Sequence, residues 1–493
     1  MNSSMIRFIL GTILKTEAVL LLLPCIIAIV YGEKQGFAFI FVAFICALTG
    51  FLFSHKKPDN TVFYLKEGCV ATALSWILLS LFGCFPFLIT KEIPNLTDAL
   101  FETVSGFTTT GASILSDVEA LSYTSLFWRS FTHWIGGMGV LVFILAVIPM
   151  SGGSHINLMR AESPGPSVGK LVPKIKSTAR ILYLIYLGMT LLEILFLLAG
   201  GMPLFDSITL SFGTAGTGGF GIKNSSLGDY SAYQQWVVTI FMILFGVNFN
   251  AFYLIVFGKI KKAIRMEEVR YYFFIILAAI AVIFLSLWNT VMGAADALRH
   301  AAFQVASIIT TTGYSTVDFD SWSQTCRAIL VLLMFIGACA GSTGGGIKVS
   351  RIVILIKTVI KELNSYIHPK SIKKIYFEHK PVEHEVVRST NVYLITFVTL
   401  FSFSLLLISF DGQDLVTAFT AVAATINNIG PGLNNVGPTC NFGIFSPFSK
   451  WVLIFDMLAG RLELFPLLIL FHPRIWRNFM GQKLKKIRRA NRF

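Results

Sequence analysis

The chain has 493 residues, of which 55% are hydrophobic and only 13% are charged, and its mean hydropathy is +0.71. A soluble protein of this length needs more charge to cover its surface, so a soluble globular fold is excluded and the bilayer is the expected solvent. The formal net charge of +14 does not indicate nucleic-acid binding, because the basic residues cluster directly outside apolar segments.

Clusters of basic residues separate the apolar runs and predict their orientation. By the positive-inside rule these segments are cytoplasmic, and both chain ends are expected in the cytoplasm. The first apolar run contains Lys15 and Glu17 and lacks a clear small-residue cleavage site, so we interpret it as a retained helix. The seven cysteines show no CxxC spacing, so neither a zinc site nor a disulfide framework is predicted. The basic clusters lie at residues 160–180, 259–270 and 351–388 and in the C-terminal sequence KLKKIRRANRF.

The predicted elements begin with two apolar helices, over residues 5–31 and 36–54, within an N-terminal unit of residues 1–60. After them one order recurs four times: a long apolar helix, a shorter segment, a glycine-containing turn and a second long helix. We therefore expect an all-α polytopic membrane protein in which four repeats surround one pseudo-fourfold pore. The repeats are predicted at residues 61–160, 161–265, 266–375 and 376–493.

The elements of each repeat follow in chain order. The first repeat has a long helix at 67–90, a short segment at 96–107, the turn TTTGA at 108–112 and a second long helix at 125–149, and the other repeats follow in the same order. The second has 178–200, 203–215, the turn GTGGF at 216–220 and 235–258. The third has 271–290, 295–309, the turn TTTGY at 310–314 and a long helix from Ser323. The fourth has 391–409, 412–426, the turn NNIGP at 427–431 and 449–471.

Each short segment, at about ten to fourteen residues, is too short to cross about 30 Å of hydrocarbon. Because the long helices of a repeat adjoin basic loops, the short segment and its turn are expected to enter from the outer face and return to it. Non-helical backbone at this depth is tolerated only where protein buries it or where it lines a wet cavity. The outer loops agree with this orientation, since they are poor in Lys and Arg and contain Asp117, Glu119, Asp229, Asp318 and Asp320.

The recurring turns suit the binding of a dehydrated cation. Glycine adopts positive φ, which lets consecutive carbonyl groups face one axis, and a ring of carbonyls replaces the water around an ion in potassium channels. The short helix before each turn directs its partially negative C-terminal end toward the same axis. Threonine and glycine are also ordinary helix-packing residues in membranes, but their recurrence at matching places favours a selectivity filter.

These features resemble the Trk/Ktr/HKT superfamily of potassium transporters. The two extra N-terminal helices and the sequences FTTTGAS, HWIGGMG (133–139), GVNF (246–249) and GACAGSTGGGIK (337–348) are similar to its TrkH/TrkG branch. The resemblance implies potassium selectivity, because glycine rather than serine stands at the first filter position of all four repeats. The fourth turn departs most from the pattern, through Asn427, Asn428 and Pro431. The filter residues implied are Thr109, Thr110, Gly111, Thr217, Gly218, Gly219, Thr311, Thr312, Gly313, Asn428, Ile429 and Gly430.

The last helix of the third repeat, from Ser323 to about Ile360, is too long for one crossing, and its middle is rich in glycine. Glycine costs a helix roughly 1 kcal/mol per residue relative to alanine, so this helix should break. A phosphate-binding loop is rejected, because Ile347 stands where that motif requires lysine. A flexible kink without a role is one interpretation. The resemblance implies instead an intramembrane gate, formed by Gly341, Ser342, Thr343, Gly344, Gly345, Gly346 and Lys348.

Charged residues also occur in the last helix of the fourth repeat, at Asp456, Arg461 and Glu463. Intramembrane charge usually faces a wet cavity or a partner, so an internal salt bridge of Arg461 with a carboxylate is one possibility. The resemblance implies that Arg461 borders the pore beneath the filter as part of the gate. His133 and Trp134 lie in an apolar helix, and we interpret them as packing residues rather than a metal site.

The function predicted is that of a potassium-translocating, non-enzymatic subunit in the cell inner membrane, with K⁺ as the transported ion and no nucleotide bound by this chain. The resemblance implies a homodimer that carries a cytosolic, TrkA-like nucleotide-binding regulator on its basic inner face. A sodium-coupled Ktr-type transporter is an alternative, against which the extra N-terminal helices argue. A membrane enzyme would need a motif such as HExxH, which this sequence lacks. A secondary transporter of another substrate usually carries inverted repeats, whereas the four repeats predicted here share one orientation.

Overall fold

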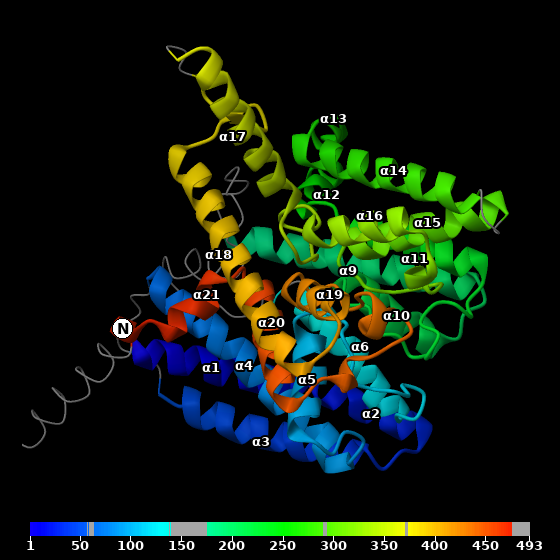
Figure 1. The fold of residues 1–493 in the computed structure, drawn as a ribbon. Coiled ribbons are helices and arrows are strands. Elements are labelled where there is room, and N and C mark those ends of the chain that lie inside the picture. The colour runs from blue at the N-terminus through cyan, green and yellow to red at the C-terminus, as the bar shows by residue number, and fades with distance from the viewer. Residues whose placement is uncertain are drawn as a thin grey trace, which may run out of the picture.

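The computed structural model describes residues 1–56, 58, 64–137, 139, 175–288, 293–369 and 373–475. An N-terminal helical hairpin comes first, formed by α1 (Ser3–Leu20), α2 (Leu22–Tyr31) and α3 (Gly36–Ser54). Gly11 of α1 and Gly50 of α3 face each other, and a Cβ atom on Gly11 would lie 2.7 Å from the carbonyl oxygen of Gly50. Small residues at a helix crossing allow this close backbone approach in membranes. The hairpin then packs on α4 of the first helical unit (Figure 1).

Four helical units follow, and in each a short helix of 12 to 16 residues lies between two further helical segments. The first contains α4 (Leu65–Thr90), α5 (Leu96–Phe107) and α6 (Tyr123–Gly137). The second contains α9 (Ile175–Ala199), α10 (Leu204–Gly216), α11 (Ala232–Phe245), α12 (Phe249–Val256) and α13 (Ile260–Ile264). The third contains α14 (Glu267–Trp288), α15 (Ala294–Ile309), η1 (Phe319–Ser321), α16 (Gln324–Phe335) and α17 (Val349–Ile367).

The fourth unit contains α18 (His384–Ile408), η2 (Ser409–Asp411), α19 (Leu415–Ile426), η3 (Asn434–Val436), η4 (Phe442–Ile444), α20 (Pro447–Arg461), α21 (Phe465–Leu468) and η5 (Ile469–Phe471). Between α17 and α18 lies a two-stranded hairpin, formed by β1 (Tyr376–Phe377) and β2 (Lys380–Pro381), in which Phe377 pairs with Lys380. Figure 1 shows α17 and the start of α18 projecting from the rest of the helices.

Two of the predicted long helices are interrupted. The helix predicted over 235–258 is wrong as a single element, because α11 and α12 meet at a bend of 93°. Gly246 and Asn248 occupy the bend, and the Asn248 side chain caps α12 by accepting the N–H of Asn250 at 2.9 Å. The helix predicted over 449–471 ends at Arg461 instead, because Glu463 and Leu464 adopt positive φ angles, of 52° and 69°, that an α-helix does not accommodate.

The predicted break in the third unit is present. The helix α16 ends at Phe335, and residues 336–348, here called the intramembrane loop after its expected position, connect it to α17. The remainder of the helix predicted over 125–149, most of the basic cluster at 160–180 and the basic C-terminal sequence lie outside the described residues.

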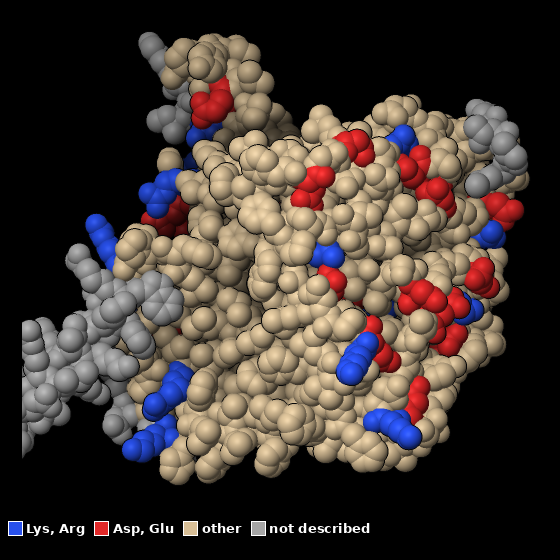
Figure 2. Space-filling view, turned by 60° about the horizontal axis from the view of Figure 1, so that its bottom comes forward, with Lys and Arg blue, Asp and Glu red and all other residues tan. Residues whose placement is uncertain are grey.

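Among the described residues, six helices are long and apolar enough to cross a membrane, or seven if the bent pair α11 and α12 counts as one span. Many large apolar side chains on these helices are exposed, such as Ile29, Phe37, Phe274 and Leu277. On the described part of the face in Figure 2, acidic side chains gather toward the right, several basic side chains lie along the left edge, and the broad area between them carries few charges. This distribution fits a surface surrounded by lipid.

Candidate functional site

The four short helices α5, α10, α15 and α19 end in the same hydrogen-bonded motif. In α5, the N–H of Thr109 donates to Gly106 O at 3.1 Å and the N–H of Thr110 donates to Ser105 O at 2.9 Å. This pair of bonds is a Schellman motif, which requires a left-handed residue after the helix. That residue is threonine or asparagine here, with φ between 54° and 58°, namely Thr109, Thr217, Thr311 and Asn428.

Two positions after the left-handed residue, each turn has a glycine that also has positive φ. These glycines are Gly111, Gly219, Gly313 and Gly430, with φ of 80°, 80°, 86° and 103°. Left-handed backbone at both positions turns the chain in the same way four times, which glycine allows without steric cost. The described backbone of the four turns is therefore equivalent even though their side chains differ.

The four turns also contact one another in a closed cycle. A Cβ atom on Gly111 would lie closer than 3.0 Å to Gly218 O, one on Gly219 equally close to Thr312 O, and one on Gly313 to Ile429 O. The cycle closes where a Cβ atom on Gly430 would lie 2.8 Å from Thr110 O. Each glycine therefore touches the backbone of the next turn. We call this arrangement the turn ring; it contains Thr109–Gly111, Thr217–Gly219, Thr311–Gly313 and Asn428–Gly430.

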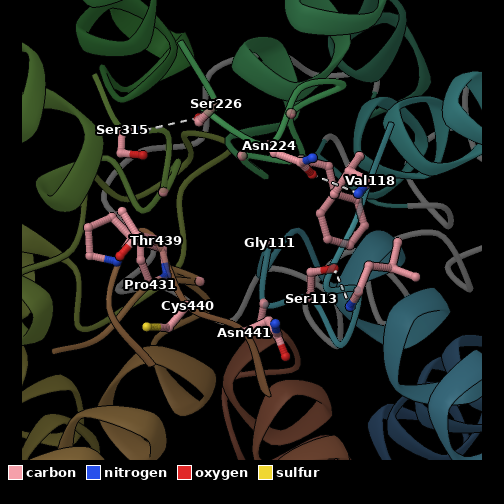
Figure 3. Close-up of a pocket in the computed structure, with 18 of the residues that line it drawn as sticks. Gly111, Ser113, Val118, Asn224, Ser226, Ser315, Pro431, Thr439, Cys440 and Asn441 are labelled. Atoms are coloured by element: carbon pink, nitrogen blue, oxygen red, sulfur yellow. Dashed lines mark hydrogen bonds between the residues drawn. The ribbon is translucent and has the colours of Figure 1, made fainter. Parts of the chain in front are cut away.

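The turn ring forms the floor of a pocket of about 170 Å³ to which all four glycines contribute. Figure 3 shows the pocket walls coming from four places in the chain: Ser113 and Val118, Asn224 and Ser226, Ser315, and Pro431 to Asn441. The turn residues buried beneath it, such as Thr110, Thr217 and Thr312, supply neutral backbone and hydroxyl oxygens. Such oxygens are suited to replace the water around a monovalent cation.

A side-chain bond closes the seam between the fourth and first turns. The Asn428 amide donates to Thr110 Oγ1 and to Met457 O, both at 2.9 Å. In the first and third turns, threonine hydroxyls two residues apart bond each other at 2.8 Å. The asparagine that departs from the threonine pattern therefore links its turn to the neighbouring turn and to α20.

A buried ion pair behind the first two turns escaped the sequence prediction. Arg129 of α6 donates to Glu102 of α5, with nitrogen–oxygen distances of 2.7 and 2.9 Å, and both side chains are almost completely buried. Glu102 also accepts from Ser113 Oγ and the N–H of Ile114, while Arg129 donates to Gly221 O at 3.2 Å. The pair thus fixes the segments that leave the first and second turns. Its sequence signal was charge inside apolar helices.

His133 has a more specific position than simple packing. Its ring lies between the first two turns, where Nε2 accepts the N–H of Phe220 at 3.2 Å and Nδ1 lies 2.7 Å from Gly106 O. Since Nε2 is an acceptor, Nδ1 carries the proton and donates to Gly106 O. Trp134 donates from Nε1 to Thr190 Oγ1 at 3.3 Å. These bonds leave His133 a neutral link between α5 and the second turn.

The intramembrane loop lies directly against the turn ring. The N–H of Gly345 donates to Thr311 Oγ1 at 2.7 Å, and Thr343 Oγ1 donates to Phe245 O at 3.3 Å. The Lys348 ammonium group donates to the carbonyl oxygens of Gly344 and Gly345, and Ser342 Oγ donates to Cys339 O at 2.6 Å. The loop is thus satisfied by its own lysine and by backbone groups of neighbouring units.

Arg461 connects the loop to the first unit. Its guanidinium group donates to Thr343 O at 3.0 Å, to Thr109 Oγ1 at 3.2 Å and to the carbonyl oxygens of Gly136 and Gly137. Glu463, the carboxylate nearest to it in sequence, pairs with Arg351 instead, and Asp456 accepts from Ser404 Oγ at 2.7 Å. The cation of Arg461 therefore lies between the turn ring and the loop.

Known proteins match this chain over most of its length. A sequence model of the TrkH family, described as a cation transport protein, matches residues 33–478. The Trk system potassium uptake protein TrkH of Salmonella typhimurium is 37% identical over 465 residues, covering 93% of this chain and 96% of that protein. TrkG of Escherichia coli K12 is 35% identical, covering 97% of this chain and all of that protein. The crystal structure of the potassium transporter TrkH from Vibrio parahaemolyticus gives a TM-score of 0.87 at 33% identity, covering 97% and 100% of the two chains.

Proposed function

Because the chain belongs to the TrkH family of cation transport proteins, we propose that it is the potassium-selective translocating subunit of a Trk-type uptake system. Its relatives are named as potassium uptake proteins, and the chain is a multi-pass protein of the inner membrane. The observation that carries the proposal is the turn ring, in which four equivalent backbone turns contact one another in a closed cycle. The membrane potential, worth about 2.3 kcal/mol per charge per 100 mV, favours inward movement of a cation.

In this proposal the residues of the turn ring form the selectivity filter. Their backbone carbonyls and threonine hydroxyls coordinate dehydrated K⁺, and the pocket above them is the outer vestibule. The backbone of the ring leaves no room for a side chain at the glycines, so its diameter is set by main-chain contact. This packing supports selectivity by a ring of fixed size.

The intramembrane loop acts as the gate below the filter. Its position against Thr311 and the bonds of Arg461 to Thr343 and Thr109 support this role. A positive charge beside the path raises the barrier to a cation, while the loop obstructs the path sterically. Opening then requires the loop to leave Thr311 and Arg461.

The assembly we propose is a homodimer that binds a TrkA-like nucleotide-binding regulator on the cytoplasmic face, with both chain ends in the cytoplasm. The segments at 151–180 and 351–388 and the basic C-terminal sequence would provide the docking surface. Reversing the charges of these three segments should reduce co-purification with the regulator. Binding that persists through all three reversals would exclude this surface.

The proposed filter is tested by Gly111→Ser in cells that lack other potassium uptake. The new side chain would push against Gly218 O, so sodium should enter more readily relative to rubidium. Gly412→Ser is the matched control, because Gly412 also has positive φ (70°) but a Cβ atom there meets no described atom within 4 Å. Unchanged selectivity in Gly111→Ser at normal expression would exclude this residue from the filter.

A further inference from the structure

Two adjacent carboxylates begin α14, and they bind two different parts of the molecule. Glu268 is buried, with 3% of its surface exposed, and it faces the intramembrane loop. Glu267 is partly exposed and faces the hairpin of β1 and β2. Because the two residues are neighbours in one helical turn, a shift of one displaces the other.

Glu268 binds both the intramembrane loop and the start of the helix that follows it. Its Oε1 accepts the N–H of Ala340 at 2.6 Å and the N–H of Ser350 at 3.2 Å. Ser350 is in the first turn of α17, where unpaired N–H groups and the helix dipole favour a carboxylate. The residue before this helix, Lys348, directs its ammonium group to the loop carbonyls. Glu268 therefore supplies from another helix the cap that α17 needs.

The same carboxylate reaches the bend of the second unit. Its Oε2 accepts from the Asn248 amide at 3.2 Å, and Asn248 in turn caps α12. Beside it, the N–H of Phe249 donates to Gly341 O at 3.0 Å and the N–H of Cys339 donates to Gly246 O at 3.1 Å. Two broken helices thus meet at one buried charge, and hydrogen bonds to a charged group are the stronger kind.

Glu267 binds the hairpin and α17 from the other side. It pairs with the Lys357 ammonium group of α17 and accepts the N–H of Glu378 at 3.2 Å. Glu378 returns the bond, because its Oε1 accepts the N–H of Glu268 at 3.1 Å. Lys357 also donates to Tyr376 O at 2.8 Å. The hairpin is therefore attached to the start of α14 by both main-chain and side-chain bonds.

The hairpin depends on this attachment. Its two-residue turn places Glu378 and His379 at φ of 51° and 60°, a left-handed pair that usually requires asparagine or glycine. Such backbone persists only where its surroundings hold it, and an isolated two-stranded hairpin is marginally stable at best. Phe377 is buried at 3% exposure, beside Lys357. Removing the contacts with Glu267 would free the turn to relax.

We propose that Glu267 and Glu268 couple the cytoplasmic hairpin to the intramembrane loop. Glu268 is a positioning residue that keeps the loop closed by holding Ala340 and Ser350, and Glu267 transmits the position of the hairpin to it. A cytoplasmic protein that lifts the hairpin away from α14 would loosen Glu268 and release the loop. The inference rests on the proposed gate and adds to it the route by which the cytoplasmic face opens it.

The first test is rubidium flux through the full-length protein in potassium-loaded vesicles without a regulator. Glu268→Gln keeps the shape but weakens the bonds to Ala340 and Ser350, so flux should rise about ten-fold. Asp296→Asn is the control, since Asp296 is an exposed carboxylate at the start of α15, outside the proposed filter, gate and docking segments, and flux should not change. A purified, folded Glu268→Gln protein with unchanged flux would overturn the role of Glu268.

The second test separates coupling from general destabilisation. Glu267→Lys places two lysines together and should raise flux, whereas adding Lys357→Glu restores the opposite charges and should lower flux again. Failure of the double variant to lower the raised flux would overturn the coupling. If deleting Gly344 and Gly345 leaves flux unchanged, the proposed gate itself fails. If that deletion raises flux while the Glu267 and Glu268 variants do not, the gate stands and only the coupling is rejected.

Discussion

The half of the helical units that contains the short helices and turns and the half that contains the intramembrane loop follow different rules. We call them the outer and inner halves, after the orientation proposed above. In the outer half, four short helices end in the same motif and lead into turns with the same left-handed positions. In the inner half, the second long helices differ: α11 bends into α12, α16 gives way to the intramembrane loop, and α20 ends at Arg461. One sequence repeat therefore produced four equal turns and unequal helices.

The proposed function accounts for this difference. A ring that surrounds a central ion needs equivalent ligands on every side, so a change in one turn disturbs the whole ring. An obstruction below the ring needs only one segment to cross the path. The inner half is free to concentrate its glycines in the third unit and its cation in the fourth, at Arg461.

The largest effect should come from breaking the equivalence of the turns with Gly219→Ala. The added Cβ would overlap Thr312 O, and φ is 80°, so potassium uptake should fall sharply, with the same loss of selectivity that is expected for Gly111→Ser. In Gly221→Ala, two residues away, the atom nearest to the added Cβ would lie at 3.4 Å, so uptake should persist. Gly430→Ala, whose added Cβ would lie 2.8 Å from Thr110 O, should reduce uptake less than Gly219→Ala. Equal uptake by Gly219→Ala and Gly221→Ala would contradict a tightly packed ring.

The second effect concerns the ion pair that supports only the first two turns. Arg129→Met leaves Glu102 buried without its partner, which should lower the free energy of unfolding by about 3–5 kcal/mol. The double variant with Glu102→Gln should recover part of this loss, because no uncompensated charge remains. Arg299→Met, which breaks the more exposed pair with Asp296, should cost no more than about 1 kcal/mol. Thermal unfolding in detergent compares the stabilities of Arg129→Met and Arg299→Met. Equal losses of stability would show that the buried pair has no special role.

The third effect sharpens the role of the inner half. Arg461→Ala removes both the cation and its bonds to Thr343 and Thr109, so flux without a regulator should rise about ten-fold. Arg461→Lys keeps the charge but loses the branched hydrogen bonding, so an intermediate flux would separate the two contributions. The preference for rubidium over sodium should stay the same in both. A flux that remains regulator-dependent in the folded Ala variant would reject the gate.

The smallest effect concerns one helix end of the outer half. Asp414 caps α19 by accepting the N–H of Thr417 at 3.1 Å, so Asp414→Ala should lower stability by about 1 kcal/mol. Hydrogen bonds from Thr417 hold the pKa of Asp414 below its ordinary value of 3.8. The stabilisation by Asp414 is therefore fully present above about pH 3.8 and is lost as the pH falls through the lowered pKa. Unfolding curves of the two proteins should converge in acid, and a difference that grows there would contradict this assignment.

The sequence was sufficient for the outer half because its signals are local. Short apolar segments, glycine turns and basic loops predicted the order of the helices, and the structure confirms the fold class. The roles of the turn and loop residues stay predictions. The bend at Gly246 was missed although Asn248, a favoured N-cap residue, was a local signal for it, because the apolar residues on both sides satisfied the pattern of one long helix.

The long-range contacts could not be read from local patterns. Glu102 and Arg129 are 27 positions apart, and Glu268 meets Ala340 and Ser350 across 72 and 82 positions. Charge in an apolar helix indicated that a partner existed but not which one. The positive φ angles of Glu463 and Leu464 had no sequence signal, since neither residue type favours them.

The bond between Asn428 and Thr110 has a consequence for the order of synthesis. The two residues are 318 positions apart, and at about 5–20 residues per second the ribosome needs roughly 16–64 s to cover that distance. During this interval the first turn can have a neighbour on one side only. The ring is therefore completed late, and a chain that stops before residue 428 leaves its first turn without the partner that closes it.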